Sequence, residues 1–142
     1  MQTLSRFARF APAATAAALV LGFAPTTGAQ QNDAGREAKP ETVMVTYHAK
    51  AGSEAKLMNV IARQWETARG LKLVQESPHT TVRGVEQGDK TYLVEIFTWR
   101  DASIPDAAPA PLRQLWAEMH DLVEPRGGRP GIDFTEVSLL VP

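Results

Sequence analysis

Three histidines, His48, His79 and His120, are the side chains of this sequence best suited to acid–base chemistry. An imidazole exchanges protons near neutral pH, so it can serve as a general base. His48 ends a β-branched and aromatic run, where it either acts as a base or bonds to solvent or backbone. His120 lies one helical turn after Trp116, where it either lines a pocket or is a partly buried core residue. His79 follows Pro78 in an expected loop and is predicted to be exposed to solvent. The histidine spacings match no metal-binding motif, so no metal site is predicted.

Glu95 is a charged residue inside an otherwise apolar run, on the same strand face as Phe97 and Trp99. A buried carboxylate is costly unless it has a partner. Glu95 is therefore expected to be either a catalytic or orienting carboxylate or one half of a structural ion pair. Its candidate partners are His48, His120, Arg83 and Arg100.

Hydrophobic periodicity predicts four strands and two helices in the order β-α-β-β-α-β. This is the order of a ferredoxin-like α+β fold. Residues 101–111 contain three prolines and are expected to form a loop. The predicted strands are 42–48, 80–85, 91–99 and 132–140, and the predicted helices are 53–69 and 112–123.

The third predicted strand is apolar on both of its faces, although two helices can cover only one face of the sheet. A second copy of the same sheet is the simplest cover for the other face, so a homodimer is expected. One face carries Tyr92, Val94 and Ile96, and the other carries Leu93, Phe97 and Trp99.

Four segments, 43–48, 94–101, 115–120 and 133–137, resemble the antibiotic biosynthesis monooxygenase-like branch of the dimeric α+β barrel superfamily. The resemblance extends over about residues 42–141. It implies a homodimer in which two four-stranded sheets face each other, with a pocket in each protomer between sheet and helices. The superfamily includes cofactor-free monooxygenases of quinols and aromatic polyketides, haem-degrading monooxygenases, and exported proteins of no known activity.

The haem-degrading relatives use an Asn late in the first strand, a Trp that ends a strand and a His on the following helix. Trp99 and His120 match the last two in type and order, whereas Tyr47 and His48 stand where the Asn would be. The resemblance thus implies that Trp99 and His120 border one pocket. The predicted catalytic residues are His48, His120 and Glu95, and the predicted substrate contacts are Trp99, Tyr47, Arg100 and Trp116, the last also a candidate core residue.

These residues suggest an oxygenase of a small aromatic or quinol-like molecule that needs no cofactor. His48 or His120 would be the base, and Tyr47 or Arg100 would donate to the developing oxyanion. One alternative is a non-catalytic module that binds an apolar ligand, such as haem held through His120. Another is an interaction protein with no ligand.

The composition excludes several function classes. The chain has 142 residues, 15 basic and 16 acidic residues and no cysteine, which indicates one domain without disulfides, a thiolate nucleophile or a lipid-anchoring cysteine. The formal net charge of −1 gives no reason to expect a nucleic acid as a partner.

The first 29 residues have the order of a cleaved secretory signal. Arg6 and Arg9 precede an apolar run over residues 10–24, and the small residues Thr27 and Ala29 follow it. The alternative is a membrane anchor, but a run of about 15 residues is shorter than the roughly 20 that span a bilayer. We therefore expect a signal peptide over 1–29, a flexible leader over 30–41 and a domain over 42–142. The mature protein would be periplasmic or extracellular, with no remaining membrane span.

Overall fold

A computed structural model describes residues 37–140 of the chain. It contains four strands and two α-helices in the predicted β-α-β-β-α-β order, and a short 3₁₀ helix lies in the expected proline-rich loop. The order predicted from hydrophobic periodicity is therefore confirmed. The elements are β1 (Glu41–His48), α1 (Glu54–Gly70), β2 (Val74–Glu86), β3 (Lys90–Trp99), η1 (Pro105–Ala107), α2 (Ala110–Leu122) and β4 (Ile132–Glu136).

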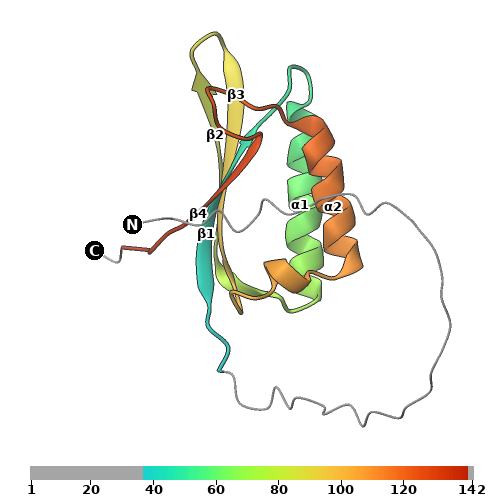
Figure 1. The fold of residues 1–142 in the computed structure, drawn as a ribbon, viewed down its shortest axis with the longest axis vertical. Helices are drawn as coiled ribbons and strands as arrows, with labels where there is room; N and C mark the ends of the chain where they lie inside the picture. The colour runs from blue at the N-terminus through green and yellow to red at the C-terminus, as the bar shows by residue number, and fades with distance from the viewer. Residues whose placement is uncertain (1–36, 141–142) are drawn as a thin grey trace, which may run out of the picture. The chain divides into compact units, whose positions relative to one another are not determined.

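The strands form one antiparallel sheet in the order β2-β3-β1-β4, and both helices lie side by side on one of its faces (Figure 1). The strands β1 and β3 are central, and Val45 pairs with Glu95 and Tyr47 with Leu93. Because paired residues point to the same face of a sheet, Tyr47 and Glu95 both face the helices. The fold is thus a two-layer α+β arrangement.

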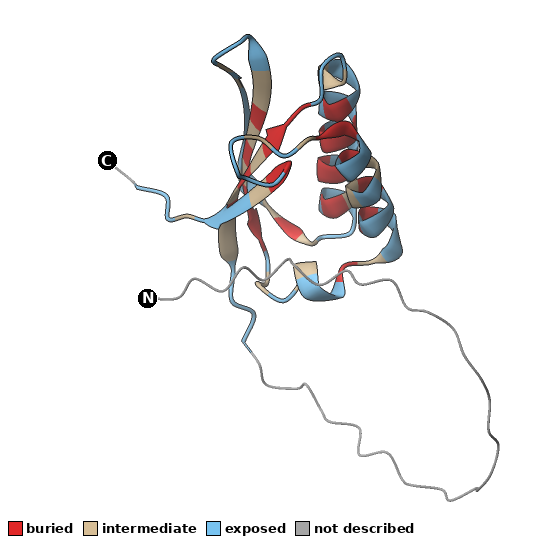
Figure 2. Cartoon of the chain, turned by 45° about the horizontal axis from the view of Figure 1, so that its top comes forward, coloured by how far each residue is buried: buried red, intermediate tan, exposed pale blue. Residues whose placement is uncertain are grey.

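The core lies between the sheet and the helices, where buried residues line the facing sides of both layers (Figure 2). Each helix contributes an apolar stripe, because its buried residues recur every three or four positions. Alternate residues of β1 and β3 complete the core. The stripe of α1 is Leu57, Val60, Ile61, Gln64, Trp65 and Ala68, and that of α2 is Leu112, Leu115, Met119 and Leu122.

Two of the predicted strands differ from the structure by more than one residue in their bounds. The expected strand 80–85 is β2, which begins at Val74, and the expected strand 132–140 is β4, which ends at Glu136. β2 has a register shift between Val74 and His79, so its start has no regular alternation that the sequence could reveal. Pro78 is tolerated there because β2 is an edge strand.

The face of β3 that points away from the helices is also apolar, as predicted. Val94 and Ile96 lie on this face and are only partly buried in the single chain. Val82 of β2, which pairs with Val94, is about half exposed. Within residues 37–140, neither helix is long and apolar enough to cross a membrane.

Candidate active site

The carboxylate of Glu95 is fully buried between β3 and the helices. Its Oε2 accepts hydrogen bonds from the Tyr47 hydroxyl at 2.9 Å and from Gln64 Nε2 at 3.4 Å, and its Oε1 lies 3.0 Å from His79 Nε2. Donors from β1, α1 and β2 therefore converge on one carboxylate and compensate for its removal from water. We call Tyr47, Gln64, His79, Glu95 and Trp116 the Glu95 cluster.

His79 and Glu95 form a histidine–carboxylate pair. A carboxylate only accepts hydrogen bonds, so Nε2 of His79 carries a proton, and in the neutral imidazole Nδ1 is then the nitrogen with the lone pair. Among the described residues, Nδ1 has no hydrogen-bond partner. The imidazole stacks on Trp65 with ring centroids 3.7 Å apart and planes 4° from parallel, and its side chain is 26% exposed. An imidazole held in one tautomer by a buried carboxylate is equipped to act as a general base.

His79 was not predicted as a site residue: it is exposed, as expected, but the prediction that it lies in a loop is wrong. It lies in β2 opposite Phe97, on the face that points toward the helices. The only available signal was indirect: Glu95 needed a buried partner, but His79 was not among the candidates considered. Because of the register shift just before His79, the sequence does not reveal which face of the sheet its side chain occupies. A shift of one residue moves a side chain to the other face.

Tyr47 is a buried donor to Glu95 and cannot also donate to a substrate oxyanion. Its hydroxyl has one hydrogen, which is directed at Glu95 Oε2. Burial, followed by the adjacent charge of Glu95 and the hydrogen bond to it, raises the pKa of Tyr47 well above its ordinary value. Tyr47 is therefore a neutral residue that holds Glu95, in place of the oxyanion donor predicted from the sequence.

Above a pH of about 10, the free energy of unfolding is expected to fall more steeply in the natural protein than in Tyr47→Phe. Because the pKa of Tyr47 is raised in the folded state, the unfolded chain releases this proton first as the pH rises. The stability that depends on the neutral hydroxyl is thus complete below the unfolded-state pKa and is lost as the pH rises toward the folded-state pKa. Urea midpoints measured over alkaline pH check this, and parallel declines in the two proteins would contradict it.

A chain of aromatic side chains borders the Glu95 cluster. Trp65 meets Phe97 edge-on at 6.3 Å, Phe97 meets Trp99 at 4.9 Å, and Trp99 meets Trp116 at 6.4 Å. Trp116 also donates its indole N–H to Gln64 Oε1 at 2.7 Å. The structure therefore brings together four of the residues predicted from the sequence, Tyr47, Glu95, Trp99 and Trp116, and adds Gln64, Trp65 and His79.

Three other predicted site residues lie outside the Glu95 cluster. His48 is fully buried, but its Nδ1 contacts the Pro130 carbonyl at 3.0 Å because it follows Tyr47 in β1 and points to the other side. Arg100 is exposed and donates from Nε to the Val74 carbonyl. His120 is exposed on α2, because it lies outside the buried stripe of that helix. Trp99 is buried beside Trp116 whereas His120 is exposed, so the structure does not bring these two predicted residues together.

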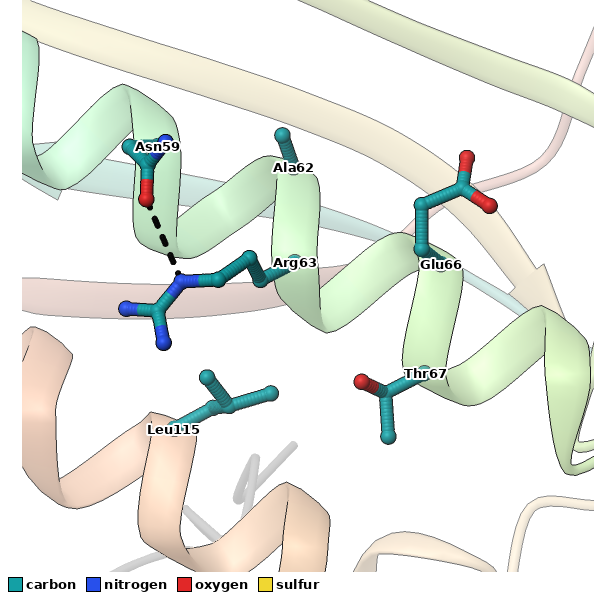
Figure 3. Close-up of a pocket in the computed structure, with 6 residues that line it drawn as sticks. All are labelled: Asn59, Ala62, Arg63, Glu66, Thr67 and Leu115. Carbon is teal, nitrogen blue, oxygen red and sulfur yellow. Dashed lines mark hydrogen bonds between the residues drawn. The ribbon is translucent and has the colours of Figure 1, made fainter.

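An open depression of about 360 Å³ lies along the outer side of α1, where Leu115 of α2 also borders it (Figure 3). Arg63 crosses it and bonds to Asn59 and Glu118. The depression includes neither His120 nor any residue of the Glu95 cluster. His120, which would hold a haem, is exposed on α2 and therefore does not fit the enclosed pocket that the resemblance implies. Within residues 37–140, no group of three or more His, Asp or Glu side chains is placed to hold a metal ion. The residues that line the depression are Asn59, Ala62, Arg63, Glu66, Thr67 and Leu115.

No protein-family model matches the sequence, and no curated protein matches it. Solved structures do resemble the fold. SnoaB, a cofactor-independent oxygenase from Streptomyces nogalater, is 18% identical with a TM-score of 0.51, over 74% of this chain and 97% of that one. A putative antibiotic biosynthesis monooxygenase from Bacteroides thetaiotaomicron is 10% identical with a TM-score of 0.54, over 72% and 91%. Rv0793 from Mycobacterium tuberculosis is 11% identical with a TM-score of 0.52, over 73% and 98%. The chain thus has the fold of the antibiotic biosynthesis monooxygenase-like proteins, as its sequence resemblance predicted.

Proposed function

We propose that this protein is a cofactor-independent monooxygenase of a small aromatic or quinol-like molecule, with the His79–Glu95 pair as its general base. The observation that carries the proposal is a partly exposed imidazole held 3.0 Å from a fully buried carboxylate. The fold, which this chain shares with a structure described as a cofactor-independent oxygenase, supports the same reaction class.

The reaction needs only the substrate and dioxygen. Nδ1 of His79 removes the proton from a phenolic O–H, and the resulting anion is electron-rich enough to reduce dioxygen at a ring carbon. A C–O bond forms there, and the imidazolium of His79 returns its proton to the outer peroxide oxygen to give a hydroperoxide. The O–O bond then breaks as the hydrogen on that carbon leaves as a proton, and the distal oxygen departs as hydroxide, which combines with that proton to give water. One oxygen atom stays on the product.

The surrounding residues prepare His79 for this task. Trp65 fixes the plane of the imidazole by stacking on it, and Glu95 fixes its tautomer. The carboxylate also stabilises the imidazolium that forms during the reaction, as in other histidine–carboxylate pairs. Tyr47 holds Glu95 in place.

Oxygen uptake with naphthohydroquinone and a panel of related phenols and quinols tests the proposed activity. With isotopically labelled dioxygen, a monooxygenase converts naphthohydroquinone to hydroxynaphthoquinone with one labelled atom, and the other appears in water. Uncatalysed autoxidation instead gives unlabelled naphthoquinone and hydrogen peroxide, which catalase detects. Oxygen uptake no faster than in buffer across the panel would contradict the proposal.

We also propose that two copies pair through the open face of the sheet. Light scattering at micromolar concentration is expected to give twice the protomer mass, because pairing buries the partly exposed Val94 and Ile96. Val94→Glu is expected to give monomers, since it places a charge in that interface. Met58→Glu introduces the same charge on the exposed side of α1 and serves as the matched control. A natural protein that stays monomeric at all concentrations would exclude this dimer.

Export of the protein is a further part of the proposal. It rests on the signal-like residues 1–29, which lie outside the described residues, as does most of the predicted leader. The intact mass of protein recovered from the cell envelope is expected to correspond to a chain that begins at Gln30. A mass that retains residues 1–29 would indicate an anchor instead.

A further inference from the structure

Gln64 is a buried amide on the otherwise apolar stripe of α1. A buried amide destabilises a fold unless its polar atoms are hydrogen-bonded. Both ends of Gln64 are bonded: Oε1 accepts the Trp116 indole N–H at 2.7 Å, and Nε2 donates to Glu95 Oε2 at 3.4 Å. One side chain therefore connects α1 to α2 and to the carboxylate on β3.

The two partners of Gln64 permit only one orientation of its amide. The indole N–H of Trp116 can only donate, so it must face the amide oxygen. The carboxylate of Glu95 can only accept, so it must face the amide NH₂. A flipped amide would direct its oxygen at the carboxylate and its NH₂ at the indole N–H. Trp116 and Glu95 together thus fix the orientation of the Gln64 amide, with its NH₂ toward the carboxylate.

We infer that Gln64, oriented by Trp116, is a positioning residue that assigns separate tasks to the two oxygens of Glu95. Oε2 is occupied by Tyr47 and Gln64, which leaves Oε1 to accept from His79. This keeps the proton of His79 on Nε2 and the lone pair of Nδ1 available. The catalytic consequence rests on the proposed function, whereas the effect on the His79 tautomer does not.

Two substitutions disturb this arrangement. Gln64→Glu places a second carboxyl group against Glu95, and two carboxylates that share a site cannot both be ionised without a large cost. His79 then loses part of its anionic acceptor. Trp116→Phe keeps an aromatic ring but removes the N–H that holds Gln64 Oε1, so the amide is anchored at one end only and its hydrogen bond to Glu95 is weakened.

Nitrogen-15 NMR of the imidazole side chains, in alkaline buffer, measures the tautomer ratio of His79. The signal is assigned by its disappearance in His79→Gln. The natural protein is expected to show mainly the Nε2–H tautomer. In Gln64→Glu and Trp116→Phe the ratio is expected to move toward Nδ1–H by about tenfold, the effect of losing a hydrogen bond to a charged group.

Matched controls separate positioning from general damage. Gln114→Glu makes the same change at an exposed site on α2, and Trp99→Phe removes a neighbouring indole while leaving both partners of Gln64 intact. Neither is expected to move the His79 ratio. Circular dichroism checks folding, and Gln64→Met removes both amide bonds without adding charge if Gln64→Glu does not fold.

An unchanged His79 ratio in folded Trp116→Phe and in the folded Gln64 variant would overturn the inference. An equal change in the two controls would overturn it as well. The NMR measurement uses no substrate, so its outcome is independent of the oxygenase assay. A shifted ratio in a protein without oxygen uptake would support the positioning role and contradict the proposed function.

Discussion

Replacing His79 with glutamine is expected to lower naphthohydroquinone-dependent oxygen uptake by about 10²- to 10⁴-fold, the usual contribution of a general base. Glutamine retains an N–H that can reach Glu95 but has no basic nitrogen to accept the substrate proton. The fold is expected to survive, because the His79 side chain is partly exposed. Initial rates from an oxygen electrode, corrected for autoxidation, provide the measurement.

His120→Gln tests which histidine is the base. The sequence resemblance favours His120, whereas the structure favours His79. The sequence resemblance assigns His120 to the pocket, whereas the structure places it on the exposed side of α2. Loss of uptake in His79→Gln with uptake retained in His120→Gln supports the His79–Glu95 base. The reverse pattern would show that His79 has only a structural role beside Trp65.

Replacing Phe97 with alanine is expected to lower the free energy of unfolding by about 3–5 kcal/mol, the range for truncating a buried phenylalanine. Phe97 is almost completely buried and lies between Trp65 and Trp99, with an edge-on ring contact to each. The substitution removes both contacts and leaves a cavity beside the ring on which His79 stacks. Urea denaturation at a fixed protomer concentration measures the change, since dimerisation would make the stability depend on concentration.

Met58→Ala is the matched control for this truncation. Met58 is 47% exposed on α1, so its replacement is expected to change the free energy of unfolding by no more than about 0.5 kcal/mol. Similar losses in the two variants would mean that the aromatic chain beside the Glu95 cluster contributes little to the core.

Local pattern in the sequence determined the elements of this fold and their order. The spacing of apolar residues in α1 and α2 follows the helical period, so each helix identifies its own buried face, and the β-branched and aromatic run of β3 identifies a strand. Glu95 likewise stands out in the sequence as a charge within an apolar run, and β3 is apolar on both sides. These properties depend on residues within one element, which is why the sequence alone reveals them.

The composition of the candidate site was decided by tertiary structure. His79 reaches Glu95 only because the register shift in β2 directs it toward the helices, and Gln64 does so only because α1 packs with that side toward β3. Trp116 and His120 lie one turn apart on α2, yet Trp116 reaches Gln64 and His120 remains exposed. Strand register and helix rotation are set by the joint packing of residues far apart in the chain, so no local pattern of polar and apolar residues specifies which side chains meet at Glu95.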